Sequence, residues 1–303
     1  MIAAAADAGA DYVKMQTIFA DDLTDRPRFE EGETGEDGEP KVIKRPYASE
    51  RERLSALELS EEDHRFFIGE CIRHHVTPFT TVFSRNRVPF VAALPWPEKI
   101  VKVASYDCGS LPLIGELCDR FDHLVISTGA STDEEVEQTA AFLQERQKTF
   151  TFLHCVTSYP NALDQCHLRR MAWLRELGGN VGWSDHTAAD TDGVKASMVA
   201  IAEGAEWIER HFTILDRSET KDGKVSITPD QLRELSAFGR LSRDEQRRIA
   251  RSLPEYETIM GVAQREMTAT ERRNRDYYRG RFASNIGGEW VYNWEEKPVF
   301  PAS

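Results

Sequence analysis

The chain has 303 residues, of which 40% are hydrophobic and 29% are charged, and its formal net charge at pH 7 is −13. These values are ordinary for a globular protein and fit one large domain with a tail, such as an α/β barrel, or two small domains. The negative charge excludes a broad nucleic-acid-binding face, but it is compatible with a local basic pocket for an anionic substrate.

Apolar runs and cysteines narrow the class of protein further. No apolar run approaches the roughly 18–20 residues that a membrane helix needs. Residues 1–11 carry early acids and lack the basic start of a signal peptide. The five cysteines form no CxxC pair and are odd in number, which favours reduced, buried thiols. We therefore expect a cytoplasmic protein with no membrane or nucleic-acid partner.

Short β-rich segments alternate with stretches of helical period along the chain. Strands are expected at residues 12–17, 77–83, 100–105, 123–128, 151–156, 180–185 and 207–212. Helices with recognisable starts are expected at residues 60–75, 131–147 and 226–241. This alternation indicates a parallel sheet. It predicts an α/β fold, a TIM (β/α)8 barrel over residues 1–250, followed by a C-terminal extension over residues 251–303.

The predicted barrel has one strand too few. The chain opens in a helical stretch, residues 2–11, so the first strand is missing or replaced. Because seven parallel strands leave two unpaired edges, we expect residues 289–294 to pair at the gap or to cover it. The polar segment 20–59 is expected to be a long loop that is functional or mobile.

Polar residues gather at the predicted carboxyl ends of the strands, where (β/α)8 enzymes carry their chemistry. Lys14 and Lys102 each lie in an otherwise apolar run, and a lysine that points into a barrel needs an anion. With the nearby Ser and Thr hydroxyls, the two lysines predict a pocket for a phosphate, or for a phosphate and a carboxylate.

Two strand-like segments are each followed by a histidine, His186 in "GWSDHT" and His211 in "WIERHFT". Two neutral imidazoles at facing strand ends can bind a divalent transition metal, with water and substrate oxygens completing its coordination. A lone histidine in such a place is more often a hydrogen-bonded structural residue, so both interpretations stay open. His64, His74 and His75 lie on one predicted helix and are expected to be solvated.

Seven stretches taken together resemble the N-acetylneuraminate (sialic acid) synthase family over about residues 3–245. They are "DAGADYVKMQT", "LSEEDHR", "VKVASYD", "VISTGAST", "LHCVTSYPNALDQCHL", "VGWSDHT" and "IERHFTILDRSETKDGKVSITPDQL". The resemblance implies a transferase that condenses phosphoenolpyruvate with an N-acylated aldose similar to N-acetylmannosamine. The products are then a nonulosonic acid of the sialic acid type and phosphate.

The resemblance also implies roles for individual residues. His186 and His211 are implied as the protein ligands of Mn²⁺, with Mg²⁺ or Co²⁺ as alternatives. The implied phosphoenolpyruvate pocket consists of Lys14, Thr81, Lys102, Ser105, Ser127, Thr157 and Tyr159. Contacts to the sugar are implied for Gln16, Tyr159 and Asp222, with Ser184 beside the metal. The implied catalytic residues are His186, His211, Lys14, Lys102 and Asp107, the last at a position where the family commonly has Glu. A homodimer is implied as well.

The sequence departs from the family pattern in places. The family's first strand, which ends in a Glu, has no counterpart, and "ETKD" (219–222) replaces "PGPD". Residues 272–284 resemble the linker into the family's C-terminal domain. Two further interpretations therefore stand beside an active synthase. One is a homologue that binds metal and a phosphorylated ligand without turnover. The other is a metal-dependent hydrolase or aldolase, which needs Asp185 as a further carboxylate ligand.

Overall fold

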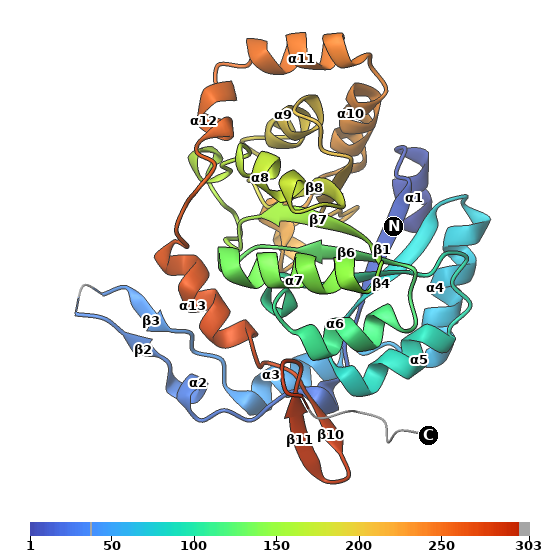
Figure 1. Ribbon diagram of the computed structural model, residues 1–303, viewed down its shortest axis with the longest axis vertical. Coiled ribbons are helices and arrows are strands. Elements are labelled where there is room, and N and C mark those ends of the chain that lie inside the picture. The colour runs from blue at the N-terminus through green and yellow to red at the C-terminus, as the bar shows by residue number, and fades with distance from the viewer. Residues whose placement is uncertain (37, 297–303) are drawn as a thin grey trace.

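Seven parallel strands form one curled sheet in the computed structural model, which describes residues 1–36 and 38–296 (Figure 1). The strands are β1 (Tyr12–Thr17), β4 (Thr77–Val82), β5 (Ile100–Val103), β6 (His123–Ser127), β7 (Thr149–Cys155), β8 (Asn180–Asp185) and β9 (Trp207–Arg210). Their order in the sheet is their order along the chain. All the strands expected from the sequence are confirmed, with bounds that differ by a few residues at most.

Helices surround this sheet; most cover its outer face, and the last of them lies beside the carboxyl ends of the strands (Figure 1). They are α1 (Ile2–Asp7), α4 (Glu61–Arg73), α5 (Val88–Ala93), α6 (Leu111–Cys118), α7 (Asp133–Glu145), α8 (Arg170–Glu176), α9 (Lys195–Ala202), α10 (Pro229–Gly239), α11 (Arg243–Ser252), α12 (Tyr256–Met260) and α13 (Ala269–Tyr278). The predicted helix starts are confirmed. The Ser60 hydroxyl accepts from the Asp63 N–H, and the Asp63 carboxylate accepts from the Ser60 N–H. Such a cap typically stabilises a helix by about 1 kcal/mol.

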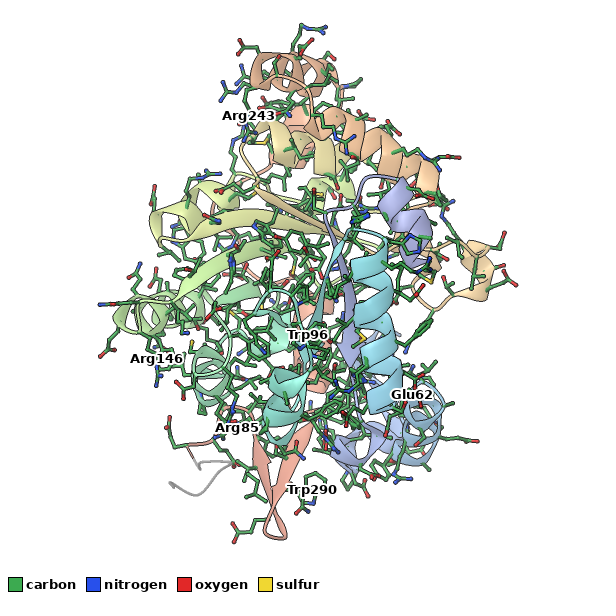
Figure 2. All side chains as sticks on the ribbon, turned by 90° about the vertical axis from the view of Figure 1, so that its right-hand side faces the viewer. Glu62, Arg85, Trp96, Arg146, Arg243 and Trp290 are labelled. Carbon is green, nitrogen blue, oxygen red and sulfur yellow. The ribbon has the colours of Figure 1, made fainter. Side chains whose placement is uncertain are left out.

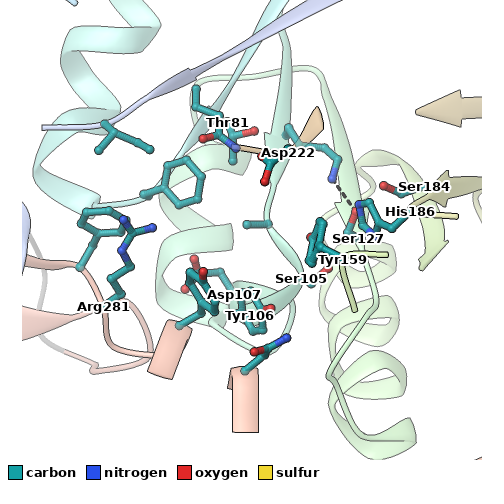
Figure 3. Close-up of a pocket in the computed structure, with 18 of the residues that line it drawn as sticks. Thr81, Ser105, Tyr106, Asp107, Ser127, Tyr159, Ser184, His186, Asp222 and Arg281 are labelled. Carbon is teal, nitrogen blue, oxygen red and sulfur yellow. Dashed lines mark hydrogen bonds between the residues drawn. The ribbon is translucent and has the colours of Figure 1, made fainter. Parts of the chain in front are cut away.

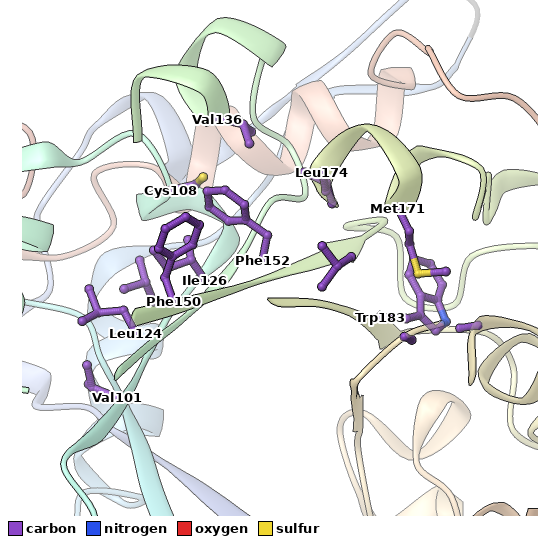
Figure 4. Close-up of a cluster of buried hydrophobic side chains, with 14 of the residues drawn as sticks. Val101, Cys108, Leu124, Ile126, Val136, Phe150, Phe152, Met171, Leu174 and Trp183 are labelled. Atoms are coloured by element: carbon purple, nitrogen blue, oxygen red, sulfur yellow. The ribbon is translucent and has the colours of Figure 1, made fainter. Parts of the chain in front are cut away.

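The core lies between the sheet and the helices (Figure 4). Leu124 and Ile126 on β6 face the helices, whereas Val125 between them belongs to a smaller apolar cluster inside the curl. This alternation follows from the two-residue period of a strand. Because Phe79 and Leu153 join Val125 in filling the interior, the space for a pocket is left at the carboxyl ends of the strands.

The complete eight-stranded barrel is not confirmed, because β1 and β9 are the two edges of the sheet. Side chains nevertheless join these edges. The rings of Tyr12 on β1 and Trp207 on β9 have centroids 4.6 Å apart. Two residues further along each strand, the Lys14 ammonium lies 3.5 Å from the Glu209 carboxylate. The sheet is therefore curled enough for its edge strands to build one site together.

For residues 289–294, the expectation of pairing at the sheet gap is wrong, and the alternative that they cover the gap stays a prediction; Asn293 contacts Phe83, Asp107 and Leu113. Strands β10 (Ala283–Ile286) and β11 (Glu289–Tyr292) pair with each other in an antiparallel hairpin. Gly287 and Gly288 form its turn, both with positive φ, which is the backbone that a two-residue hairpin turn requires. Local pairing across this turn takes up the strand that the gap would have needed.

Segment 20–59 is not a structureless loop. It contains η1 (Ala20–Asp22), α2 (Arg28–Glu31), β2 (Glu33–Thr34), β3 (Pro40–Val42) and α3 (Tyr47–Ser55). It is joined to the C-terminal part of the chain, since the Arg26 guanidinium donates to the Tyr277 carbonyl at 2.7 Å and the Arg281 guanidinium donates to the Glu50 carboxylate. Together, residues 20–59 and 262–296 form what we call the outer layer. Residues 297–303 of the expected C-terminal extension lie outside the described residues.

The surface is rich in charged side chains, among them Glu62, Arg146 and Arg243, which point outward from their helices in Figure 2. His64 does not belong to this surface, contrary to expectation: it is 1% exposed, and its ring bonds the Ser60 carbonyl and the Thr17 hydroxyl. All five cysteines are free and buried. Across the described ranges, none of the helices combines the length and apolar character required to cross a membrane.

Candidate active site

A pocket of about 740 Å³ opens at the carboxyl ends of the strands (Figure 3). The predicted site residues that line it are Lys14, Gln16, Thr81, Lys102, Ser105, Asp107, Ser127, Tyr159, Ser184, His186, His211 and Asp222. The parallel register explains part of this gathering, because Gln16 is the partner of Thr81, and Thr81 is the partner of Lys102. Thr157 is fully buried behind the wall, and its assignment as a substrate contact stays a prediction.

Two lysines from different strands share one carboxylate at the base of the pocket. Lys14 and Lys102 have their ammonium nitrogens 3.5 Å and 3.2 Å from the two carboxylate oxygens of Glu209. Lys102 also donates to the Ser127 hydroxyl, and the Ser184 hydroxyl donates to Glu209 at 2.9 Å. These contacts fix both ammonium groups on the pocket side of the sheet.

Glu209 is a site residue that the sequence analysis missed. It stands two residues before His211, and alternate side chains of a strand share a face. Choosing His211 for the site therefore already implied Glu209, so the signal was present in "WIERHF".

The charges around Glu209 favour an anionic ligand. Burial opposes ionisation of Glu209, but the charges of Lys102 and Lys14 outweigh it and lower the pKa of this carboxyl. Burial lowers the pKa of Lys14, and the Glu209 charge works against that fall. With both lysines protonated, two cations share one carboxylate, which leaves the base of the pocket with a net positive charge.

The two predicted metal-binding histidines meet in this pocket. The ring centroids of His186 and His211 are 5.5 Å apart, and the Tyr159 ring lies 4.2 Å from that of His186. The His186 Nδ1 is 2.9 Å from the Val156 carbonyl, so it carries the proton and leaves the Nε2 lone pair free. Burial and the charge of His211 lower the pKa of His186 to about 3. The imidazole is therefore neutral, as a metal ligand must be.

A divalent metal fits this donor set only with outside ligands. Among residues 1–36 and 38–296, no three His, Cys, Asp or Glu side chains come together as a metal site. Two imidazoles would thus be completed by water and substrate oxygens. Asp185 does not help, because it is fully buried and holds Arg210 at 2.6 Å and the Thr187 N–H at 2.9 Å. The hydrolase or aldolase interpretation loses the third ligand that it needed.

Asp107 lies in the opposite wall of the pocket. It is 7% exposed, and it accepts hydrogen bonds from Asn293 at 2.9 Å and from Ser110 at 3.2 Å. Burial outweighs these bonds and raises the pKa of Asp107 to about 6. This carboxyl can therefore change its protonation near neutral pH, as a group that transfers protons must. Asn293 follows β11, so the outer layer reaches the wall of the pocket.

Further cations at the pocket mouth were also missed by the sequence analysis. They are Arg45, Arg53, Lys221, Arg273 and Arg281. All of them lie outside the seven strands, most in stretches that the sequence presents as a polar loop or a linker. No local pattern marks them, because only the tertiary contacts of the outer layer bring them to the pocket.

Comparison with known proteins gives one matching family and several similar sugar acid synthases. Residues 1–245 match the family described as the NeuB family. The chain is 28% identical over 247 residues to N,N'-diacetyllegionaminic acid synthase of Campylobacter jejuni, covering 78% of this chain and 68% of that protein. It is 27% identical over 289 residues to pseudaminic acid synthase of the same species, covering 93% and 76%. With N-acetylneuraminate-9-phosphate synthase of Drosophila melanogaster it shares 30% identity over 188 residues, covering 61% and 49%.

Solved structures share the fold. An N-acetylneuraminic acid synthetase from Leptospira borgpetersenii, in complex with citrate, aligns with a TM-score of 0.65 and 23% identity, covering 91% of this chain and 84% of that one. The spore coat polysaccharide biosynthesis protein spsE of Bacillus subtilis aligns with a TM-score of 0.68 and 23% identity, covering 91% and 71%. At this identity the likeness concerns the fold, which agrees with the curled parallel sheet described above.

Proposed function

The chain belongs to the NeuB family, and from this premise we propose that it condenses phosphoenolpyruvate with the open-chain form of an N-acylated amino sugar. The products are a 2-keto sugar acid of the nonulosonic type and phosphate. One observation carries the proposal: Lys14, Lys102, His186 and His211 line one pocket at the carboxyl ends of the strands. These are the groups that a doubly anionic substrate and a metal-polarised aldehyde require.

The base of the pocket suits phosphoenolpyruvate, which carries a phosphate and a carboxylate. Lys102 is 4% exposed and Lys14 is partly buried, so their charges act in a site with little water. The hydroxyls of Ser105 and Ser127 lie in the same wall and add neutral donors. Charge-assisted hydrogen bonds to phosphate from this set position the substrate.

His186 and His211 are the residues that would hold a divalent metal, which when bound supplies Lewis-acid polarisation of the aldehyde carbonyl. The Val156 carbonyl keeps the His186 proton on Nδ1, so the ring presents its other nitrogen in the correct tautomer. The Asp222 carboxylate lies 3.6 Å from His211 Nδ1, close enough for its charge to act on the second ring but too far for a hydrogen bond. We take Mn²⁺ as the first metal to test.

The reaction joins two carbons and breaks one carbon–oxygen bond. C3 of phosphoenolpyruvate attacks the aldehyde carbon, the aldehyde oxygen gains a proton, and water adds to C2. Phosphate then leaves C2 with its bridging oxygen, and a ketone remains. Asp107, whose protonation changes near neutral pH, is the carboxyl suited to accept a proton from the water, whereas Glu209 stays ionised between the two lysines.

The test is a condensation assay on the full chain with phosphoenolpyruvate, Mn²⁺ and a panel of N-acylated amino sugars. Phosphate release and 2-keto acid formation are both measured. We expect equal amounts of both products, and a loss of at least a hundredfold in Lys102→Gln. Lys41→Gln, at an exposed lysine of β3, is the matched control and should behave as wild type. If no acceptor yields a 2-keto acid in the wild-type chain, the proposal is wrong.

A further inference from the structure

Four cations line the outer part of the pocket, and the three arginines among them gather around one carboxylate. Arg45 and Arg53 come from segment 20–59, Lys221 precedes η6 (Gly223–Val225), and Arg281 follows α13. Glu50 on α3 is the shared carboxylate. We call these four cations the outer cluster. They stand out in a chain whose formal net charge is −13, because they concentrate positive charge at one place.

Glu50 is fully committed to the three arginines. It is 5% exposed and accepts from Arg53 at 2.9 Å and 3.0 Å and from Arg281, while Arg45 lies 3.7 Å away. Burial opposes its ionisation, but the hydrogen bond from Arg53 and the charge of Arg281 outweigh burial and lower the pKa of Glu50 to about 2. Glu50 therefore carries a full negative charge at neutral pH, and it cancels only one of the three guanidinium charges.

Lys221 adds a fourth positive charge with no partner of its own. It forms no ion pair with any residue in the described ranges. Burial and the charges of Arg45 and Arg53 lower its pKa, which places the ammonium within the field of the arginines. With Arg273 and Asp222, which line the same pocket, the mouth holds five cations and two carboxylates, Glu50 and Asp222, a formal net charge of +3. Like charges held together repel, so an anionic ligand here is stabilised by relief of that repulsion as well as by direct contact.

The position of the outer cluster identifies which part of a substrate it would contact. Lys221 is the neighbour of Asp222, whose carboxylate lies 3.6 Å from the His211 ring. In Figure 3, Asp222 appears between Arg281 on one side of the pocket and His186 on the other. The pocket thus has two cationic regions, Lys14 and Lys102 at its base and the outer cluster at its mouth, and Asp222 separates Arg281 from His186 in this view.

We propose that the outer cluster is a binding subsite for a phosphate group on the acceptor, so that the acceptor is an N-acylated amino sugar phosphorylated at the end remote from its aldehyde. This inference rests on the proposed function. Phosphoenolpyruvate takes the inner cations, and the aldehyde carbon must face the histidines. A phosphate on the anomeric carbon would block the aldehyde, and Arg281 lies across Asp222 from His186 in Figure 3, so the phosphate is placed on the end of the sugar remote from the aldehyde. A dianion matches a net charge of +3 better than a neutral hydroxyl does.

The first experiment is titration calorimetry in the presence of saturating phosphoenolpyruvate and Mn²⁺-free buffer, so that the inner lysines are occupied and no turnover occurs. The probes are N-acetylmannosamine 6-phosphate, unphosphorylated N-acetylmannosamine and inorganic phosphate. We expect the sugar phosphate to bind at least tenfold more tightly than the neutral sugar and than inorganic phosphate, with an affinity that falls as salt rises. Equal affinity for the phosphorylated and neutral sugars would overturn the inference.

Substitutions in the chain test whether Lys221 is responsible for the tighter binding of the sugar phosphate. Lys221→Gln should weaken binding of the sugar phosphate by roughly ten- to a hundredfold, the usual range for loss of one charged contact. Lys221→Glu should weaken it further. Lys224→Gln is the matched control, because it removes an exposed lysine three residues along that does not line the pocket. Equal losses in the Lys221 and Lys224 variants would show a general charge effect and contradict the subsite.

The two proposals fail in different ways. If the wild-type chain binds the sugar phosphate through Lys221 but forms no 2-keto acid when Mn²⁺ is added, the condensation fails and the subsite stands. If the chain condenses the neutral sugar as efficiently as its phosphate, the condensation stands and the subsite fails. The affinity for phosphoenolpyruvate is also measured in each variant. If it falls as much as the affinity for the sugar phosphate, the outer cluster binds phosphoenolpyruvate and not the acceptor, and the inference is wrong.

Discussion

Glu50→Gln tests whether the outer cluster depends on a single buried carboxylate. The variant keeps the size of the side chain and removes its charge. Arg45, Arg53 and Arg281 then face one another without a carboxylate between them. Breaking a buried ion pair by neutralising one partner typically costs roughly 3–5 kcal/mol, because the remaining charge stays desolvated.

The pKa of Glu50 gives an independent magnitude. A fall from 4.5 in the unfolded chain to about 2 in the folded one corresponds to about 3 kcal/mol of folding free energy at pH 7. The folded pKa is the lower one, so this contribution is complete well above pH 4.5 and is lost as the pH falls toward 2. By linkage, about 2.5 kcal/mol remains at pH 4 and about 1.5 kcal/mol at pH 3.

The assay is urea unfolding of the wild-type chain and the variant at pH 7 and at pH 4. We expect Glu50→Gln to lower the free energy of unfolding by about 3 kcal/mol at pH 7, and by about 1 kcal/mol less at pH 4. Glu52→Gln, at an exposed glutamate of the same helix, is the control and should change stability by less than about 0.5 kcal/mol. A Glu50→Gln effect below about 1 kcal/mol, or one that does not shrink in acid, would refute the reasoning.

Three further predictions concern the inner site. His186→Ala and His211→Ala should each abolish Mn²⁺ binding in calorimetry, whereas His74→Ala, at the half-buried residue that follows α4 and does not line the pocket, should bind as wild type; retained binding in either site variant would contradict the metal site. Glu209→Gln should lower turnover by at least a hundredfold without weakening the binding of phosphoenolpyruvate, because it removes the carboxylate that contacts both Lys14 and Lys102. A higher KM for phosphoenolpyruvate with unchanged turnover would count against this role of Glu209. Asp107→Asn should flatten the pH dependence of stability: with its folded pKa near 6, the wild-type chain loses about 2–3 kcal/mol relative to the variant between pH 4 and pH 8, and parallel pH profiles would show that the carboxyl is not perturbed.

Much of the inner site was predictable because strand ends converge in a parallel sheet. Short apolar runs located the strands, and the residues after them, such as His186 and His211, had to meet at one edge. Lys14 and Lys102 could be assigned to the interior because a lysine is rarely buried in an apolar run unless an anion balances its charge. Glu209 follows from the same alternation. The homodimer implied by the family resemblance stays a prediction, which light scattering measures directly.

Contacts between distant segments leave little signal in the local sequence, and the expectations that were wrong depended on such contacts. Residues 289–294 were expected to pair at the sheet gap or to cover it, and the pairing is wrong because Gly287 and Gly288 form a hairpin turn beside them. His64 was placed in solvent, although a ring can be buried when Ser60 and Thr17 satisfy both of its nitrogens. Arg45 and Arg281 could not have been found, because they are more than two hundred residues apart in sequence and meet through tertiary contacts, among them those with Glu50.

The inner site and the outer cluster are held in place in different ways, and this difference bears on substrate specificity. The inner site is built from strand ends, whose positions are fixed by the hydrogen bonds of the sheet. The outer cluster is built mostly from segments that side chains join to one another, such as Glu50 to Arg281, and to a helix outside the sheet, such as Arg275 to Glu135 of α7. A substitution in the outer layer can therefore change how the acceptor is held while the lysines and histidines keep their positions. On the proposed function, acceptor choice and carbon–carbon bond formation should respond to separate sets of mutations, with KM for the acceptor moving in one set and turnover in the other.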